Sequence, residues 1–105
     1  MNRDNVQQWV DELEFGDYKQ ARGFFHTPDY LRNHGEVGGS CALGVADLIR
    51  TPNPYEMYAG RFIQTVMWLG LSQNELRTIA RMNDVEAKTL PEIGAWVRDH
   101  WLKEE

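Results

Sequence analysis

The chain has 105 residues, 42% of them hydrophobic and 11% aromatic, which is enough apolar content for one packed domain and too much for a disordered chain. No apolar run approaches the ~18 residues that cross a bilayer, and the polar start of the chain does not have the pattern of a signal peptide. The net charge is −5 and no segment forms a basic stripe, so neither a membrane nor nucleic acid is expected as a partner.

The first predicted helix has its N-cap at Asp4 or Asn5 and ends near Gly16, which supplies a C-terminal stop. Apolar residues recur along this helix at helical spacing: Val6, Trp9, Val10 and Leu13. Residues 17–39 lack such a period and contain several glycines. A short hairpin within residues 22–37 is one interpretation of this segment.

A second helix is predicted over about residues 40–50, and the Thr-Pro-Asn-Pro run at 51–54 ends it. Apolar residues lie on nearly every side of this helix: Cys41, Ala42, Leu43, Val45, Ala46, Leu48 and Ile49. Gly44 costs roughly 1 kcal/mol of helix stability relative to alanine, which indicates that another backbone packs closely there. Because a helix that is apolar all round is a buried one, we predict that residues 40–50 form the centre of the domain.

A third helix is predicted from Pro54 or Tyr55 to Leu69, and Gly70 ends it. The apolar residues of this helix fall on one face: Tyr58, Phe62, Val66 and Leu69. The three predicted helices and the two that follow lie in a chain without internal repeats or long linkers. We therefore expect a mainly α fold, a compact single-domain bundle of four to five helices over residues 1–105, arranged around the helix at 40–50.

Two capping boxes begin the remaining helices. Ser72 with Glu75 starts a fourth helix, which we expect to end at Arg81 or Met82. Thr89 with Glu92 starts the last helix. This helix carries an amphipathic stripe: Ile93, Trp96, Val97, His100 and Trp101.

Cys41 is the single cysteine, which suits a reducing cytoplasm, and it lies at a helix start, where N–H groups and the helix dipole favour a thiolate. A catalytic thiol also needs a base, and His100, the only histidine after it, falls in a strongly helical pattern. A zinc site made of His26, His34 and Cys41 would lack a fourth ligand. We therefore predict that Cys41 is a packing residue and that the protein uses no catalytic residue, metal or cofactor.

Several short motifs follow one another along the chain: Gly-Asp-Tyr-Lys-Gln at 16–20, Cys-Ala-Leu-Gly-Val at 41–45, Leu-Gly-Leu-Ser at 69–72, Met-Asn-Asp at 82–84 and Ile-Gly-Ala at 93–95. In order and spacing they resemble a family of small phage and prophage proteins. Members typically have Gly-x-Tyr-x-Gln early, Cys-Cys-Leu-Gly-Val in the middle, and Leu-Asn-Asp followed by Phe-x-x-Ile-Ala near the end. The resemblance implies a phage or prophage origin and expression in a bacterial cytoplasm, and it implies no activity.

This chain departs from that family pattern at two positions. Ala42 stands where the family has the second cysteine of the pair, and Asp47 stands where a further cysteine is common. If thiol or metal chemistry were the purpose of the family, this member would have lost it.

The polar residues of these motifs fall where helices end. One interpretation is structural: such residues cap helices or form Asx turns. The alternative is that the junctions after the first and fourth helices meet at the start of the second helix. They would then form a small polar pocket whose backbone N–H groups at 39–41 favour an anion. The residues that would bind a ligand there are Tyr18, Lys19, Gln20, Arg22, Gly39, Ser40, Cys41, Asn83 and Asp84.

These observations favour a protein that acts by binding. Given the phage resemblance, we expect it to modulate a protein of the host, with a defence component as one candidate. Exposed aromatic residues such as Tyr55, Tyr58 or Trp101 would anchor the contact. The first alternative is a protein that binds a small anionic ligand or a nucleotide, and the second is a cysteine-dependent enzyme that uses Cys41. The oligomeric state stays open.

Overall fold

The computed structural model describes residues 1–18, 20, 41–50 and 60–102. These residues form five α-helices and one π-helical turn: α1 (Arg3–Phe15), α3 (Ala42–Arg50), α4 (Gly60–Leu69), α5 (Gln73–Asp84), α6 (Leu90–Val97) and η1 (Arg98–Leu102). Helices account for 79% of the described residues and no strand occurs among them, so the mainly α prediction is confirmed. The predicted hairpin at 22–37 lies outside the described residues.

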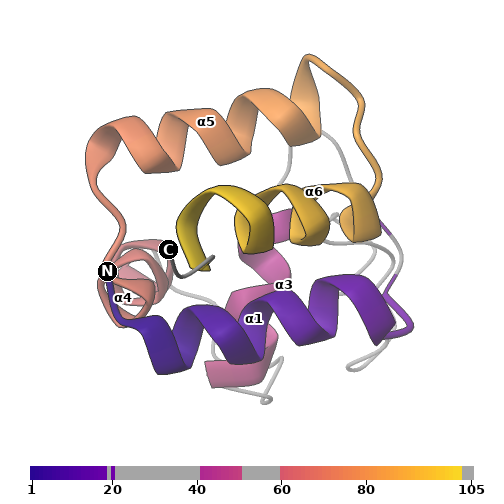
Figure 1. The fold of residues 1–105 in the computed structure, drawn as a ribbon. Coiled ribbons are helices and arrows are strands. Elements are labelled where there is room, and N and C mark those ends of the chain that lie inside the picture. The colour runs from indigo at the N-terminus through magenta and orange to yellow at the C-terminus, as the bar shows by residue number, and fades with distance from the viewer. Residues whose placement is uncertain (19, 21–40, 51–59, 103–105) are drawn as a thin grey trace, which may run out of the picture.

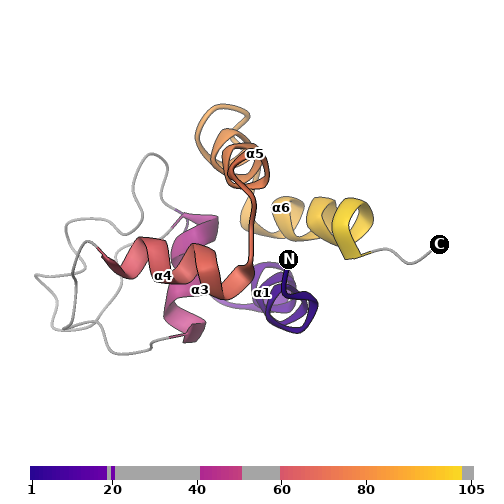
Figure 2. The same cartoon turned by 90° about the vertical axis from the view of Figure 1, so that its left-hand side faces the viewer.

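The helices α5, α6 and α1 follow one another from top to bottom in Figure 1, with α4 seen nearly along its axis at one side. A turn of 90° shows that α3 and α4 lie on the other side of the molecule from α6 (Figure 2). The helix α6 packs mainly against α1, whereas α3 contacts α1, α4 and α5. The described chain therefore has an α1–α6 side and an α3–α4 side, and α5 contacts both α3 and α6.

The helix α1 buries the four apolar residues expected of it, Val6, Trp9, Val10 and Leu13. The prediction of its start was wrong, because the N-cap is Asn2, whose Oδ1 accepts a hydrogen bond from the backbone N of Asn5 at 3.1 Å. The backbone N of Asn2 donates to Leu69 O at 2.9 Å, and Asn5 Nδ2 donates to Trp68 O at 2.8 Å. These two bonds fasten the start of α1 to the end of α4.

The helix α3 begins at Ala42, close to the predicted start, and its residues 42–47 are all buried. One of them is charged. The Asp47 carboxylate accepts a hydrogen bond from the Thr65 hydroxyl of α4 at 3.1 Å and pairs with Arg50 at 3.4 Å. The indole N–H of Trp9 donates to Ala42 O at 2.8 Å, which joins α1 to the first turn of α3.

The helix α4 ends at Leu69 as predicted, and Gly70, at φ +70°, supplies the left-handed residue that follows it. The predicted start at residues 54–55 lies outside the described residues. The predicted apolar face was wrong in part. Leu69 is buried, but Phe62 is exposed and Thr65 takes the buried position that faces α3. The hydrogen bond between Thr65 and the buried Asp47 determines which face of α4 is turned toward α3. A pattern of apolar residues cannot predict such a polar pair.

Both predicted capping boxes are present. Ser72 and Glu75 exchange backbone and side-chain hydrogen bonds at the start of α5, and Thr89 and Glu92 do so at the start of α6. The hydrogen bonds from Thr89 lower the pKa of the Glu92 carboxyl. The helix α5 extends to Asp84, two residues beyond the later predicted end.

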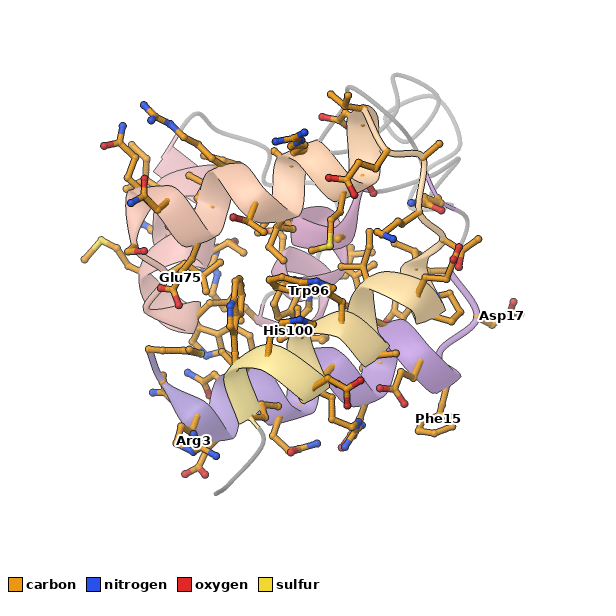
Figure 3. All side chains as sticks on the ribbon, turned by 45° about the horizontal axis from the view of Figure 1, so that its top comes forward. Arg3, Phe15, Asp17, Glu75, Trp96 and His100 are labelled. Carbon is orange, nitrogen blue, oxygen red and sulfur yellow. The ribbon has the colours of Figure 1, made fainter. Side chains whose placement is uncertain are left out.

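The last helix ends in the π-helical turn η1, which the sequence stripe did not predict. In such a turn the backbone bonds span five residues, so the residue that follows Val97 into the core is Leu102 and not Trp101. His100 is exposed; its ring stacks on Trp96 with centroids 4.2 Å apart, and Figure 3 shows the two side chains next to each other. The Arg3 guanidinium donates to Leu102 O at 2.8 Å and ties this turn to α1.

Candidate binding site

Asn83, at the end of α5, is a buried side chain that joins three parts of the chain. Its Oδ1 accepts hydrogen bonds from Gln20 Nε2 at 2.9 Å and from the backbone N of Ala42 at 3.2 Å. Its Nδ2 donates to Asp84 Oδ1 at 2.7 Å, and Gln20 Nε2 also donates to Lys88 O at 2.7 Å. The structure therefore brings Gln20, Asn83 and Asp84 together at the start of α3, as the alternative interpretation of the sequence expected for the two junctions.

The other predicted site residues are placed differently. Tyr18 is half-buried at the end of α1, where burial, and then the charge and hydrogen bonding of Glu12, raise the pKa of its hydroxyl. A Cβ added at Gly16 would lie 2.6 Å from the Tyr18 ring, so this glycine lets the ring fold back over the helix end. Four of the predicted ligand-binding residues lie outside the described residues: Lys19, Arg22, Gly39 and Ser40.

Cys41 stands at the N-cap position of α3, and Val45 N donates to its carbonyl oxygen at 3.1 Å. The pKa of its thiol is raised above the ordinary value of 9.0, chiefly because the side chain is buried and further because Asp84 is near. Hydrogen bonds from the backbone N–H groups of Gly44 and Leu43 oppose this rise without reversing it. The thiol is therefore protonated at neutral pH, which makes it a poor nucleophile.

The backbone N–H groups at the start of α3 have protein partners. Ala42 N donates to Asn83 Oδ1, and the N–H groups of Leu43 and Gly44 are directed at the Cys41 sulfur. An anion at this helix end would have to displace these partners and lie near the Asp84 carboxylate. This arrangement corresponds to the structural interpretation of the junction, in which Asn83 and Cys41 cap the helix.

A groove of about 350 Å³ opens next to this junction, between the start of α3, Phe62 of α4 and one face of α5. The α5 residues in its wall extend from Leu76 to Asp84, a length of ~12 Å at 1.5 Å per residue. Its wall includes, among the described residues, Cys41, Ala42, Leu43, Phe62, Leu76, Arg77, Ile79, Ala80, Asn83 and Asp84. The apolar part of this wall was not predicted from the sequence, although the spacing of Leu76, Ala80 and Asn83 (i, i+4, i+7) places them on one face of a helix.

Comparison of the chain with protein-family models, curated proteins and solved structures gave no match. The described helices include none that is long and apolar enough to span a membrane. Within the described residues, no group of three or more His, Cys, Asp or Glu side chains could hold a metal ion.

The side of α4 that faces away from α3 carries two exposed apolar side chains. Ile63 is 61% exposed and Met67 is 73% exposed, and they stand one helical turn apart. We call this pair the α4 ridge. Phe62, 37% exposed, lies next to the ridge in sequence and forms part of the groove wall.

Proposed function

We propose that this protein acts by binding another protein through the α4 ridge. The observation that carries the proposal is that Ile63 and Met67 present adjoining apolar side chains to solvent on one helix face. Single exposed apolar residues are ordinary in monomeric proteins, whereas apolar side chains that adjoin one another mark contact surfaces. Met67 also has the flexible thioether side chain found at surfaces that adapt to a partner.

The charge of the chain indicates the kind of partner. Residues 1–17 carry one arginine against five acidic residues, a net charge of −4 within the −5 of the whole chain. The hydrogen bonds of Asn2 and Asn5 to Leu69 and Trp68 hold the first turn of this acidic helix against the end of α4. The net charge would attract a basic partner at long range, so the association rate would fall with added salt.

The motifs shared with small phage and prophage proteins support the further proposal that the partner is a protein of a bacterial host, met in its cytoplasm. A component of host defence is the first candidate. The α4 ridge is the surface through which such a partner would be bound.

The experiment compares capture from a bacterial lysate by the wild-type protein, by the double variant Ile63→Glu/Met67→Glu, and by Phe15→Glu. Phe15 is a matched control, because its side chain is 81% exposed, and Figure 3 shows it at the far end of α1 from Arg3. We expect a captured protein that the double variant loses and Phe15→Glu retains, with all three proteins folded by circular dichroism. Capture that is unchanged in the double variant, or lost equally in both, would contradict the proposal.

A further inference from the structure

We propose that the groove between α3, α4 and α5 is a binding site for a small, largely apolar ring-containing molecule with a hydrogen-bond donor directed toward Asp84. This inference goes beyond the proposed contact through the α4 ridge, because Ile63 and Met67 are not among the residues that form the groove wall. The groove has its own lining, size and polarity, and these three properties define its ligand.

The size and lining favour an apolar molecule. At about 350 Å³, the groove lies near the lower end of the range for small-molecule sites, which suits one or two rings. Leu43, Leu76 and Ile79 contribute apolar wall, and the small side chains of Ala42 and Ala80 leave the space open. Water against such a wall is released when an apolar ring replaces it, which favours binding.

The polarity of one end follows from the hydrogen bonds already described. Asn83 is a fixed part of the wall, because its Oδ1 accepts two bonds and its Nδ2 donates to Asp84. The Asp84 carboxylate lies in the groove wall, so this end of the groove is negatively charged and favours a ligand that brings a hydrogen-bond donor. We therefore expect the ligand to place a hydrogen-bond donor at this end of the groove. The donor is either an uncharged N–H or O–H group or a cationic amine.

The same geometry disfavours an anionic group at this end. The first backbone N–H of α3 already donates to Asn83 Oδ1, and an anion at this end would lie beside the Asp84 carboxylate of the groove wall. Arg77, the cationic residue of the described wall, lies seven residues from Asp84 along α5, ~10 Å away at the helical rise. The ligand class expected here differs in charge from the anion that the sequence suggested.

The test uses three probes that share one ring system and differ in charge: indole, tryptamine and indole-3-acetate. Titration is followed by the amide resonances of the full chain. We expect saturable shifts confined to residues 41–43 and 76–84, and tryptamine should bind on the order of fivefold more tightly than indole-3-acetate, as suits a partly exposed charge pair. Absence of saturation for every probe, or shifts centred on other residues, would overturn the proposal.

Variants locate the site and its polar end. Ala80→Phe fills the groove from an exposed position on α5, and Ala95→Phe places the same ring on an exposed position of α6. We expect Ala80→Phe to abolish binding of all three probes, with Ala95→Phe binding as the wild type does. Asp84→Asn should keep indole binding and remove the preference for tryptamine. Undiminished indole binding by folded Ala80→Phe would refute the site, and an unchanged preference in Asp84→Asn would refute its polarity.

The double variant Ile63→Glu/Met67→Glu separates this proposal from the preceding one. It should bind indole with wild-type affinity even where it no longer captures a partner protein. If it loses both properties while it remains folded, the groove and the ridge are one site and the inference of a separate small-molecule site fails.

Discussion

The helices α1 and α6 pack much more closely against each other than α3 and α5 do. A Cβ added at Gly94 of α6 would lie 2.9 Å from Glu14 Cγ and 3.0 Å from Leu13 Cβ, so these two helices touch almost backbone to backbone. Between α3 and α5, in contrast, a groove of about 350 Å³ remains beside a hydrogen-bonded junction at Asn83. The close packing of α1 against α6 leaves no room for a ligand, whereas the groove between α3 and α5 does.

The tight side is also closed by charge. Arg98 donates to Glu14 Oε1 and to Asp11 Oδ1, both at 2.9 Å, and these carboxylates raise the pKa of the guanidinium. The open side is held by the hydrogen bonds of Asn83 at one end and by the Asp47–Thr65 pair between α3 and α4. We infer that the α1–α6 pair is a rigid base against which the groove keeps its shape.

The largest expected effect comes from widening the tight side. Gly94→Val forces side-chain atoms into Leu13 and Glu14, and we expect a loss of about 3 kcal/mol in the free energy of unfolding, near the upper end of typical overpacking costs. Urea denaturation measures it. Ala95→Val, at the exposed neighbouring position, is the control and should change stability by less than about 0.7 kcal/mol. An unchanged free energy of unfolding in Gly94→Val would show that the two sides do not differ in packing tightness.

A smaller effect is expected at the junction on the open side. Asn83→Ala removes the acceptor of Ala42 N and one of the two acceptors of Gln20 Nε2, and the loss of these bonds should cost about 2 kcal/mol. Asn74→Ala, an exposed asparagine in the first turn of the same helix, is the matched control. Hydrogen exchange at Ala42 should increase in Asn83→Ala and not in Asn74→Ala. Equal stability of the two variants would mean that water replaces the Asn83 side chain without cost.

The smallest effect concerns the Cys41 thiol. Because burial raises its pKa, we expect native Cys41 to react with a disulfide reagent at neutral pH on the order of tenfold more slowly than in the unfolded chain. The fold favours the protonated thiol, so this contribution to stability is complete below the unfolded pKa and is lost as the pH rises above 9.0 toward the folded value. A native thiol as fast as the unfolded one would instead support the cysteine-enzyme alternative.

Features that depend on neighbours in sequence could be predicted. The capping boxes at Ser72–Glu75 and Thr89–Glu92 are local hydrogen-bond patterns, and the apolar stripe of α1 has an uninterrupted helical period. The meeting of Gln20 with Asn83 was one of two interpretations of the polar residues at these helix ends, because buried polar groups need partners with or without a ligand.

Features that depend on contacts between distant elements could not be predicted. The rotation of α4 follows from Thr65 donating to Asp47, and a threonine in an apolar helix gives no sign of such a partner. The π-helical turn that buries Leu102 looks like ordinary helix in the sequence. The groove exists because of how three helices cross, and although Asn83 and Asp84 were among the candidate site residues, its apolar wall was not predicted.

The link between Arg3 and the η1 turn has a consequence for how the chain folds. Its guanidinium donates to carbonyl oxygens at positions 101 and 102, and the helix that carries it packs mainly against α6. Because α1 is synthesised well before α6, its apolar residues Val10 and Leu13 are not covered by α6 until the later helix has emerged. Contacts of such sequence separation slow folding and leave apolar surface open in the nascent chain, so α1 is the segment that most needs protection during synthesis.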